Sequence, residues 1–505
     1  MNRKYFSANY IYTGLCLTFF FLLFSLLSIN AEFTLLGFLF IIALFLLLGP
    51  FKEYLPIIFL IAVWYIPGQT APRGLLEEHL IFRWITHIAI PCITAFYFAK
   101  DLVKRKTWDL SPFFLPMICL FFLICVSAIY NQSNFLDFAS CISIYLRYPL
   151  LFLLLINWEI KDSSLEKIIP CFFILILAQI PETLFRALIW GIRGDAISYT
   201  LGSFGSFPLG VYCLYAIAFL TAQATVIGLK WYQLALTTVF ILIGGLGEIK
   251  ALFIFSGPVI FLTVLFCRVK TKTIVSRIIP ITAIVALALY FVFENWETLT
   301  GGGKNLLGNI VLYVRLLFEG RSSYELPYIT RVDQINIIAN MLISSPTNLF
   351  VGFGPGSSLA GNFSGSPGVV AATMSRLIWA GILIIQYVAV VGDLGLLGFI
   401  FFGFLFFRIL AFIMRYRNNI SDPKHKIYAE AFIGIFAFYA VLGPLYNIVW
   451  RYDGSNFIMW VLLAILYRRY KKDSRQALQR HYSNSGSVEI NFPTVQSNTQ
   501  TAQVF

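Results

Sequence analysis

The sequence predicts an all-α fold, a polytopic transmembrane helical bundle of roughly 12–14 spans with one large extracytoplasmic loop that contains short helices. The first observation is composition: 59% of the 505 residues are hydrophobic, only 12% are charged, and Phe alone occurs 51 times. A soluble domain carries about 25% charged residues, so this chain lacks the polar side chains to cover a water-facing surface of its size. The second observation is a series of apolar runs of about 20 residues, the length that crosses a bilayer as a helix.

Fourteen apolar runs are candidate spans, and their order divides the chain into four parts. They lie near residues 10–29, 33–49, 55–67, 81–99, 111–129, 138–157, 168–190, 208–228, 232–247, 251–267, 274–292, 378–414, 427–447 and 456–468. The run 378–414 is long enough for a tilted span plus a half-helix. We therefore predict the N-terminal part of the bundle over 1–292, the loop over 293–377, the C-terminal part of the bundle over 378–468 and a disordered cytoplasmic tail over 469–505, where Gln, Ser, Asn and Thr predominate.

Lysine and arginine are distributed unequally between the two sides of the predicted bundle. If the N-terminus lies inside, the inner segments before the tail hold eighteen of these residues, whereas the short outer loops hold only Arg73, Arg193, Lys250 and Arg451. Positive charge collects on the cytoplasmic side of membrane proteins, so both termini are predicted in the cytosol. The net charge of +13 then reflects topology, because it is scattered among inner loops and forms no nucleic-acid-binding surface.

Patterns that bind metals are missing from the sequence. The eight cysteines fall in spans or at their inner edges without a C-x-x-C pair, and there is no D-x-D, no H-E-x-x-H and no His/Cys cluster. We therefore expect no metal and no cofactor. An enzyme that uses a nucleotide sugar with a divalent cation is disfavoured for the same reason.

The predicted loop, from about Phe293 to Arg376, is the most informative segment, because loops of this length are uncommon unless they are functional. The apolar run 304–318 predicts a helix that lies in the membrane interface. A second helix is predicted to begin at Thr330, a plausible N-cap, and to stop at 344–346. Its expected buried stripe consists of Val332, Ile335, Ala339 and Leu342.

Arg331 occupies the first turn of this second helix, where a cation opposes the helix dipole. The position is favourable if an anion docks beside the free N–H groups of the helix start, and the alternative is an exposed or ion-paired arginine. A glycine segment, 352–358, follows. Its residues Gly352, Gly354 and Gly356 either let a substrate approach the backbone closely or form a plain tight turn.

Two ordered groups of motifs carry a family resemblance. The first consists of Arg331-x-x-x-Ile335-x-x-x-Ala339, Ser345-Pro346, Leu349-Phe350-Val351-Gly352-Phe353-Gly354-Pro355-Gly356-Ser357 and Gly392-Asp393-Leu394-Gly395-Leu396-Leu397-Gly398. The second consists of Arg193-Gly194 and Leu201-Gly202-Ser203-Phe204-Gly205-Ser206, with a fainter similarity at Gly247-Glu248-Ile249-Lys250. In this order the motifs resemble the outer loops of the O-antigen polymerase / O-antigen ligase superfamily. By topology the resemblance covers most of the chain.

The resemblance implies glycosyl transfer on the outer face of a bacterial inner membrane. The family's donor is a growing glycan on undecaprenyl pyrophosphate, which a polymerase of O-antigen, capsule or exopolysaccharide moves onto a lipid-linked repeat unit and a ligase moves onto lipid A-core. Membrane lipids and a chain-length regulator are the further partners it implies. Family ligases resemble one another in carrying a His in the large loop, whereas the histidines here are His79, His87, His425 and His481. This departure favours the polymerase.

The residues that could support this chemistry are arginines and carboxylates. A pyrophosphate leaving group needs cations to hold its developing charge, and arginine binds phosphate bidentately. A charge within a span is costly and usually functional, which singles out Arg147 and Arg186, although Arg186 could instead snorkel to the interface. The predicted catalytic arginine is Arg331, and the predicted pyrophosphate-binding residues are Arg147, Arg186, Arg193 and Arg376.

The acceptor hydroxyl would be helped by a general base, and no histidine lies in the large loop to supply one. We predict Glu182 and Glu248 as the catalytic carboxylates. Glu182 lies one turn before Arg186, so the two could equally form a structural i,i+4 pair. Further candidate bases are Asp195, Asp333 and Asp393.

Two alternatives to the polymerase stay open. One is the ligase variant of the same chemistry. The other is a lipid-linked oligosaccharide flippase or another secondary transporter, which would also use buried arginines to escort a pyrophosphate. A transporter more naturally has short loops and two related halves, and this sequence has one large loop and no evident repeat. A purely structural membrane protein would explain neither Arg147 nor the loop.

Overall fold

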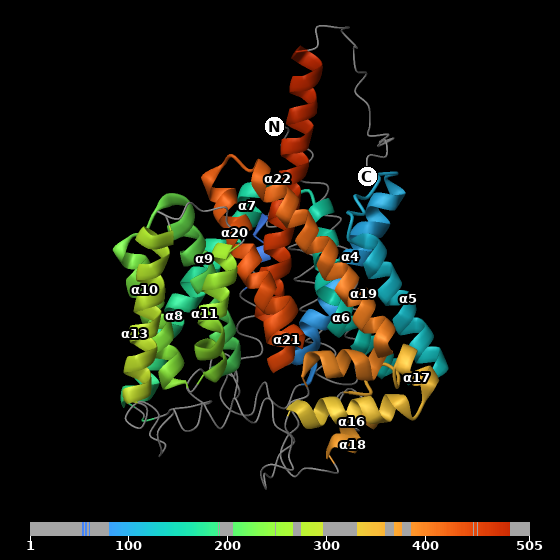
Figure 1. The fold of residues 1–505 in the computed structure, drawn as a ribbon. Helices are drawn as coiled ribbons and strands as arrows, with labels where there is room; N and C mark the ends of the chain where they lie inside the picture. Colours follow the sequence, from blue (N-terminus) through green and yellow to red (C-terminus); the bar gives the residue numbers. More distant parts are fainter. Residues whose placement is uncertain are drawn as a thin grey trace, which may run out of the picture.

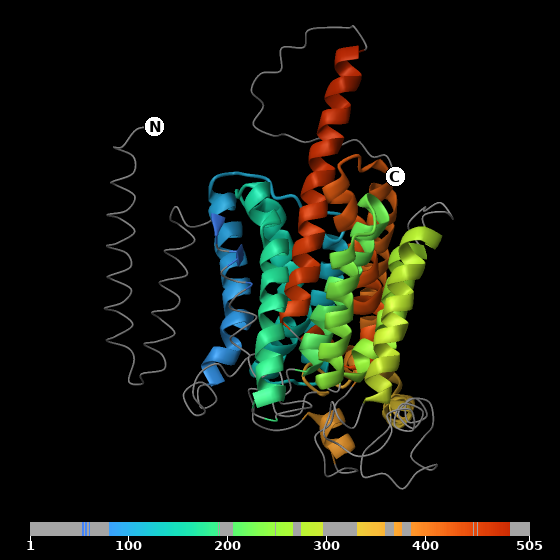
Figure 2. The same cartoon turned by 90° about the vertical axis from the view of Figure 1, so that its left-hand side faces the viewer.

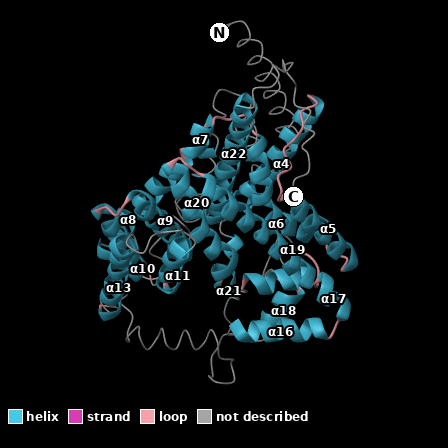
Figure 3. Ribbon diagram, turned by 45° about the horizontal axis from the view of Figure 1, so that its top comes forward, coloured by secondary structure: helices cyan, strands magenta, loops and turns pink. Residues whose placement is uncertain are grey.

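The computed structural model describes residues 53–54, 56–57, 60, 80–189, 191, 206–247, 249–265, 274–295, 331–358, 368–375, 385–447, 449–451 and 453–484. Every regular element in these ranges is a helix (Figures 1 and 3). Six helices of this part are long and apolar enough to cross a membrane, and three further apolar helices are shorter. The predicted helical membrane bundle is therefore confirmed. The number of spans stays a prediction, because the runs before residue 80 lie almost wholly outside the described residues.

The described helices include those of the apolar runs from residue 81 onward and, between them, several shorter helices. They are α4 (Leu80–Val103), α5 (Phe114–Tyr130), α6 (Phe135–Asn157), α7 (Asp162–Glu166), α8 (Ile168–Ile189), α9 (Ser206–Ile227), α10 (Trp231–Leu246), α11 (Lys250–Leu265), η4 (Ile274–Ile278), α13 (Ile279–Glu294), α16 (Arg331–Ile343), α17 (Pro346–Val351), α18 (Val369–Ser375), α19 (Gln386–Tyr416), η6 (Arg417–Asn419), α20 (Pro423–Ala437), η7 (Phe438–Leu442), α21 (Gly443–Tyr446), η8 (Val449–Arg451) and α22 (Asp453–Asn484).

The centre of the bundle is formed by α20 and α22, with α9 on one side and α6 on the other (Figure 1). Helix α9 is apolar around its whole circumference. In its most apolar stretch of 18 residues, 78% of the residues are buried among other helices, as expected for a helix without a polar face. Helix α13 is also apolar, but only 28% of the residues in the corresponding 18-residue stretch of Val275–Glu294 are buried. Its remaining apolar surface suits contact with lipid, because hydrocarbon chains are as apolar as the side chains.

Three short helices, α16, α17 and α18, lie across one end of the bundle, which we call the loop face (Figures 1 and 2). Helix α16 lies across the ends of the spans in Figure 1. Helix α17 packs on α19 and α5, and α16 packs on α19. The other end, where α7 and the start of α20 lie, is called the opposite face. The predicted interface helix at 304–318 lies outside the described residues.

Helix α19 is interrupted at Gly395, which has φ 65° and ψ −165°. Only glycine adopts this backbone conformation without strain, so the break is set by the residue type. Residues 386–394 precede it, and residues 396–416 continue through the bundle. A half-helix followed by a tilted span was expected for the long apolar run 378–414, and the described part of that run has this arrangement.

Helix α16 has the predicted boundaries but a different buried stripe. Its buried residues are Gln334, Ile338 and Leu342, whereas the predicted stripe residue Ile335 is 47% exposed. The stripe is shifted because Gln334 faces inward and its side-chain oxygen accepts a hydrogen bond from the Ile385 N–H at 3.0 Å. Apolar periodicity alone could not place an inward-facing glutamine, so the predicted stripe was wrong at Ile335, whereas Leu342 is buried and Val332 and Ala339 are half-buried.

The predicted disordered tail begins too early. Helix α22 continues to Asn484, so residues 469–484 are helical. Their sequence contains good helix formers and an i,i+4 ion pair between Arg469 and Asp473 at 3.0 Å, which supports a helix after the apolar pattern ends. Residues 485–505 lie outside the described residues.

Candidate functional site

Arg331 is anchored at the loop face by the end of another helix. Its Nε donates a hydrogen bond to the carbonyl oxygen of Tyr446 at 2.9 Å, and its guanidinium carbon lies 4.6 Å from the centre of the Tyr446 ring. Tyr446 is the last residue of α21, and Asn447 after it is extended, so this carbonyl belongs to a helix C-terminus. A cation is favoured at that end of a helix, which offsets the unfavourable position of Arg331 at the start of α16.

The ring of Tyr446 is itself held by aromatic neighbours. It stacks on Phe207 of α9 with 5.9 Å between centroids and 10° between planes, and it meets Phe255 of α11 edge-on at 5.4 Å. Three helices therefore fix the platform on which the Arg331 guanidinium lies. A guanidinium over an aromatic face gains cation–π attraction while its N–H edge remains directed sideways.

Arg147 is the second arginine of the candidate site and lies inside the bundle. It belongs to α6, is 1% exposed, and its guanidinium carbon lies 4.6 Å from the centre of the Tyr148 ring. A buried charge in a membrane bundle is costly and usually functional, and this arginine is among the largest fully buried side chains described.

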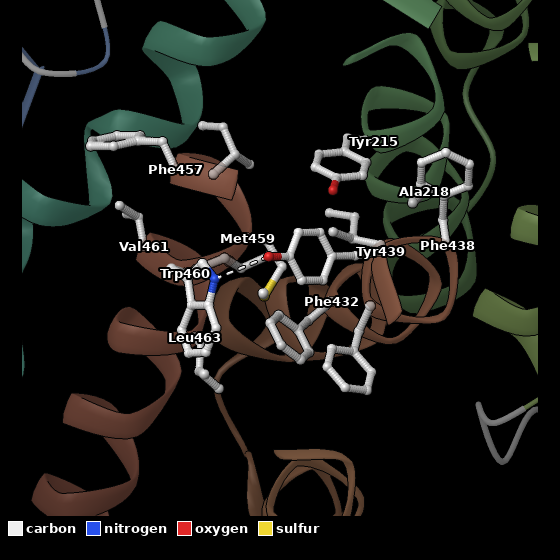
Figure 4. Close-up of a cluster of buried hydrophobic side chains, with 14 of the residues drawn as sticks. Tyr215, Ala218, Phe432, Phe438, Tyr439, Phe457, Met459, Trp460, Val461 and Leu463 are labelled. Atoms are coloured by element: carbon white, nitrogen blue, oxygen red, sulfur yellow. Dashed lines mark hydrogen bonds between the residues drawn. The ribbon is translucent and has the colours of Figure 1, made fainter. Parts of the chain in front are cut away.

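The surroundings of Tyr439 form a polar patch within an apolar core. Its hydroxyl donates to the Asn456 side chain and accepts a bond from the Trp460 indole at 3.4 Å, as the dashed line in Figure 4 shows. Its backbone carbonyl, in the π-helical turn η7, accepts from the Trp450 indole at 2.9 Å. The hydroxyl of Tyr215, from α9, faces the same region in Figure 4.

Arg331 contacts the end of the helical stretch that also contains Tyr439. Tyr439 and Tyr446 are seven residues apart on the continuous path from η7 to α21. Seven helical residues correspond to about 10 Å along the axis and about two turns. The polar patch at Tyr439 and the anchor of Arg331 at Tyr446 therefore belong to one element.

The glycine segment 352–358 packs against the break in α19. Gly352, Gly354 and Gly356 have φ values of 77°, 99° and 83°, which disfavour other residues. A Cβ on Gly352 would lie 2.4 Å from the backbone carbon of Asp393, and one on Gly354 would lie 2.6 Å from the Ser133 hydroxyl. The Phe353 N–H donates to the Gly392 carbonyl at 2.8 Å. Gly352 and Gly354 therefore permit close approach of protein to protein; contact with a substrate stays a prediction.

Asp393 joins this segment to the bundle. The carboxylate is 1% exposed and accepts hydrogen bonds from the Tyr145 hydroxyl at 2.9 Å, the Ser357 hydroxyl at 3.0 Å, and the Ser358 N–H and hydroxyl, both at 2.9 Å. Tyr145 lies two residues before Arg147 on α6. The sequence indicated Asp393 only as one candidate base. An aspartate inside an apolar run was the sequence signal for its central position.

The other predicted site residues are only partly within the described part of the chain. Glu182 is half-buried on α8, and Arg186 follows one turn later, with a side chain outside the described residues. Helix α8 packs on α7, α9 and α10, away from the loop helices. Asp333 is half-buried on α16. The residues outside the described ranges are Glu248, Arg193, Arg376 and Asp195.

The described residues contain no group of three or more His, Cys, Asp or Glu side chains arranged to hold a metal ion. What the arrangement at the loop face offers is positive charge on rigid supports. Guanidinium groups fixed in this way can bind a diphosphate and stabilise charge that develops on it, because they need no reorganisation during the reaction.

Comparison with protein-family models gives no match for this chain, and comparison with curated proteins gives no similar sequence.

Proposed function

We propose that this protein is a polymerase of lipid-linked oligosaccharide repeat units, which transfers a glycan from undecaprenyl pyrophosphate to an acceptor sugar hydroxyl on the outer face of a bacterial inner membrane. The observation that carries the proposal is the anchoring of Arg331 by the α21 carbonyl end and the Tyr446 ring. Support comes also from Arg147, which is buried inside the bundle, and from the apolar helices, which suit a polyprenyl chain.

In the proposed reaction, the acceptor hydroxyl attacks the anomeric carbon of the donor glycan. A new carbon–oxygen bond forms as the bond from that carbon to the phosphate oxygen breaks, and the bonding electron pair leaves with undecaprenyl pyrophosphate. The hydroxyl proton passes to a carboxylate base, for which Glu182 and Glu248 are the candidates. Arg331 and Arg147 stabilise the negative charge that gathers on the leaving diphosphate, with Arg186, Arg193 and Arg376 as further candidate contacts.

The proposal is tested by the length of the polysaccharide that variants make. We expect Arg331→Ala to abolish long chains while expression and membrane insertion persist, and Arg331→Lys to restore them only in part, because lysine keeps the charge but lacks the planar fork. Arg415→Ala is the matched control, since this exposed arginine lies at the far end of α19. Normal chain-length ladders from a stably inserted Arg331→Ala protein would overturn the assignment.

Variants of Tyr446 test the anchoring of Arg331 while the charge of the arginine stays unchanged. Tyr446→Phe keeps the aromatic face and the backbone carbonyl, so polymer length should be unchanged. Tyr446→Leu removes the cation–π contact, which is worth about 0.5–2 kcal/mol, so activity should fall between about twofold and thirtyfold. Equal activity of the two variants would mean that the ring does not position the arginine.

Reconstitution distinguishes the polymerase from the alternative functions. Purified protein in vesicles is given lipid-linked repeat units on the loop-face side. Longer lipid-linked glycans formed without translocation support the polymerase. Translocation without elongation identifies a flippase, and transfer that requires lipid A-core identifies a ligase; either result would exclude the proposed reaction.

A further inference from the structure

The opposite face carries a histidine held between two carboxylates, far in the fold from the loop helices. His425 lies in the first turns of α20 and is 5% exposed. Its Nε2 faces the Glu166 Oε1 of α7 at 3.0 Å, and its Nδ1 faces the Asp422 Oδ2 at the start of its own helix. The side chain thus connects the short helix between α6 and α8 with the central helix α20.

Hydrogen-bond chemistry decides which form of His425 fits this site. An ionised carboxylate can only accept hydrogen bonds, and a neutral imidazole carries a single N–H. Both contacts are therefore satisfied together when both ring nitrogens carry a proton. If one proton leaves, one nitrogen lone pair faces a carboxylate oxygen across a hydrogen-bond distance, and that contact becomes repulsive.

The charged groups around His425 come from three elements. Helix α7 contributes Glu166 and Asp162, and α20 contributes Lys424, which also pairs with Glu166. Helix α22 contributes Arg469 and Lys472 at the pocket, Arg468, which pairs with Asp162 at 2.8 Å, and Asp473, which pairs with Arg469. Asp162 and Glu166 thus each have a cationic partner from another helix. Among these residue types, only histidine has a side chain that ordinarily changes charge near neutral pH.

The buried histidine lines a pocket at the opposite face. The pocket has a volume of about 110 Å³ and is lined by Asp162, Leu165, Glu166, His425, Ile465, Arg469 and Lys472. The pocket gives protons a path to the ring, and it gives the neighbouring helix ends room to separate. A pH-responsive element requires a titratable side chain that protons can reach and a packing contact that has two states.

We propose that His425, Glu166 and Asp422 form a proton-operated clasp, closed when the imidazole is doubly protonated and opened when it loses a proton, which ties α7 to α20 at the opposite face. Opening releases the start of α20. The same helix leads through η7 to α21 and ends at Tyr446, the residue that anchors Arg331. The clasp does not depend on the proposed glycosyl transfer, and its test needs no substrate.

The test is hydrogen–deuterium exchange of full-length protein in lipid nanodiscs, with rates corrected for the intrinsic effect of pH. In the wild-type protein, protection of residues 162–166 and 423–427 should fall about tenfold or more between about pH 6 and about pH 9, the range across which histidine ordinarily loses its proton. Protection that is constant over this range would overturn the proposal.

Glu166→Gln is the decisive variant, because an amide can satisfy a neutral imidazole. The Gln oxygen still accepts from Lys424, its NH2 donates to Nε2, and Nδ1–H still donates to Asp422. Protection should then stay high across the pH range, with a change of less than about twofold. A wild-type-like fall in this variant would show that another group titrates and would refute the clasp.

His425→Gln provides a second variant that does not rely on the first. A glutamine cannot donate to both carboxylates in the imidazole geometry, so protection of the two segments should be low at every pH. Protection of α5, which packs on α6, α17 and α19, serves as the internal control for global folding. A pH-dependent fall that persists in His425→Gln would exclude the histidine as the responsible group.

Discussion

Arg331 carries a charge that opposes the dipole of its own helix, and its guanidinium lies at the C-terminal end of α21 instead. The arginine is therefore compatible with folding without any bound anion, and the proposed diphosphate contact adds to an existing anchor. Asp393 is a comparable case: the feature that made it a candidate base, a carboxylate in an apolar run, has a structural consequence in four hydrogen bonds.

Substitution of Asp393 tests this structural role at the level of one residue. Asp393→Ala leaves the Tyr145 hydroxyl, the Ser357 hydroxyl and the Ser358 N–H buried without their acceptor, and each such group costs about 1–3 kcal/mol. We expect a loss of about 3 kcal/mol or more in unfolding free energy. Asp393→Asn keeps an acceptor oxygen and should cost much less. Detergent-based thermal unfolding measures both, and equal loss in the two variants would contradict this account.

A pH effect on the acid side follows from Asp422. Burial opposes ionisation of this carboxyl, but hydrogen bonds from His425 and from the Lys424 N–H outweigh it and hold the pKa of Asp422 below its ordinary value. A depressed pKa in the folded state contributes stability above the unfolded value of about 3.9, and this stability is lost as pH falls through the folded value.

Asp422→Asn isolates that contribution, because asparagine caps a helix as well as aspartate does. Between about pH 5 and about pH 3, the wild-type protein should lose more thermal stability than the variant, since only the wild-type protein must protonate Asp422. Identical slopes of melting temperature against pH in the two proteins would show that Asp422 contributes nothing to acid stability.

At the level of elements, the loop face depends on the break in α19. Gly395 interrupts the helix, and a Cβ there would lie 2.4 Å from the Phe350 carbonyl carbon. Residues 350–353 pass so close that Gly352 and Gly395 meet backbone to backbone, and the Ser127 hydroxyl of α5 donates to the Val351 carbonyl at 2.7 Å. The break therefore allows α17 to pack on α19.

Two glycines of the same helix provide a matched comparison. Gly395→Ala combines a backbone conformation that costs about 1–3 kcal/mol for a non-glycine residue with a clash against α17. It should lower the melting temperature and increase hydrogen exchange in residues 346–358. Gly403→Ala is the control, because a Cβ there meets nothing within 4 Å and alanine favours a helix. A neutral Gly395→Ala would mean that the break is not required for loop docking.

For the whole molecule, the loop helices and the His425 clasp lie at opposite ends of the bundle (Figure 1). The predicted topology places the loop face outside the cell and the opposite face in the cytosol, in line with the distribution of Lys and Arg. The proposed reaction and the proposed clasp would then act in different compartments. The continuous helical stretch from α20 through η7 to α21 connects the two sites.

Topology is measured by the accessibility of single introduced cysteines. Asn340→Cys lies on the exposed side of α16, and Asn419→Cys lies in exposed η6 at the other end. A membrane-impermeant maleimide should label Asn340→Cys in intact cells, and Asn419→Cys only after the membrane is opened. The parent protein controls for the native cysteines. The reverse pattern would invert the orientation and remove the outer-face reaction.

The helical membrane bundle could be predicted from the sequence alone, because hydrophobicity and span length are properties of local segments that lipid selects directly. The sequence also indicated the ends of α16, from the Ser-Ser-Pro stop, and the candidate arginines, from the cost of charge in apolar runs. Only the tertiary structure decided that Gln334 faces inward, that α22 remains helical to Asn484, and that Asp393 binds Ser357 and Ser358. The anchoring of Arg331 by Tyr446 belongs to the same class, because residues 115 positions apart meet through packing of whole helices, and no local pattern encodes such a pairing.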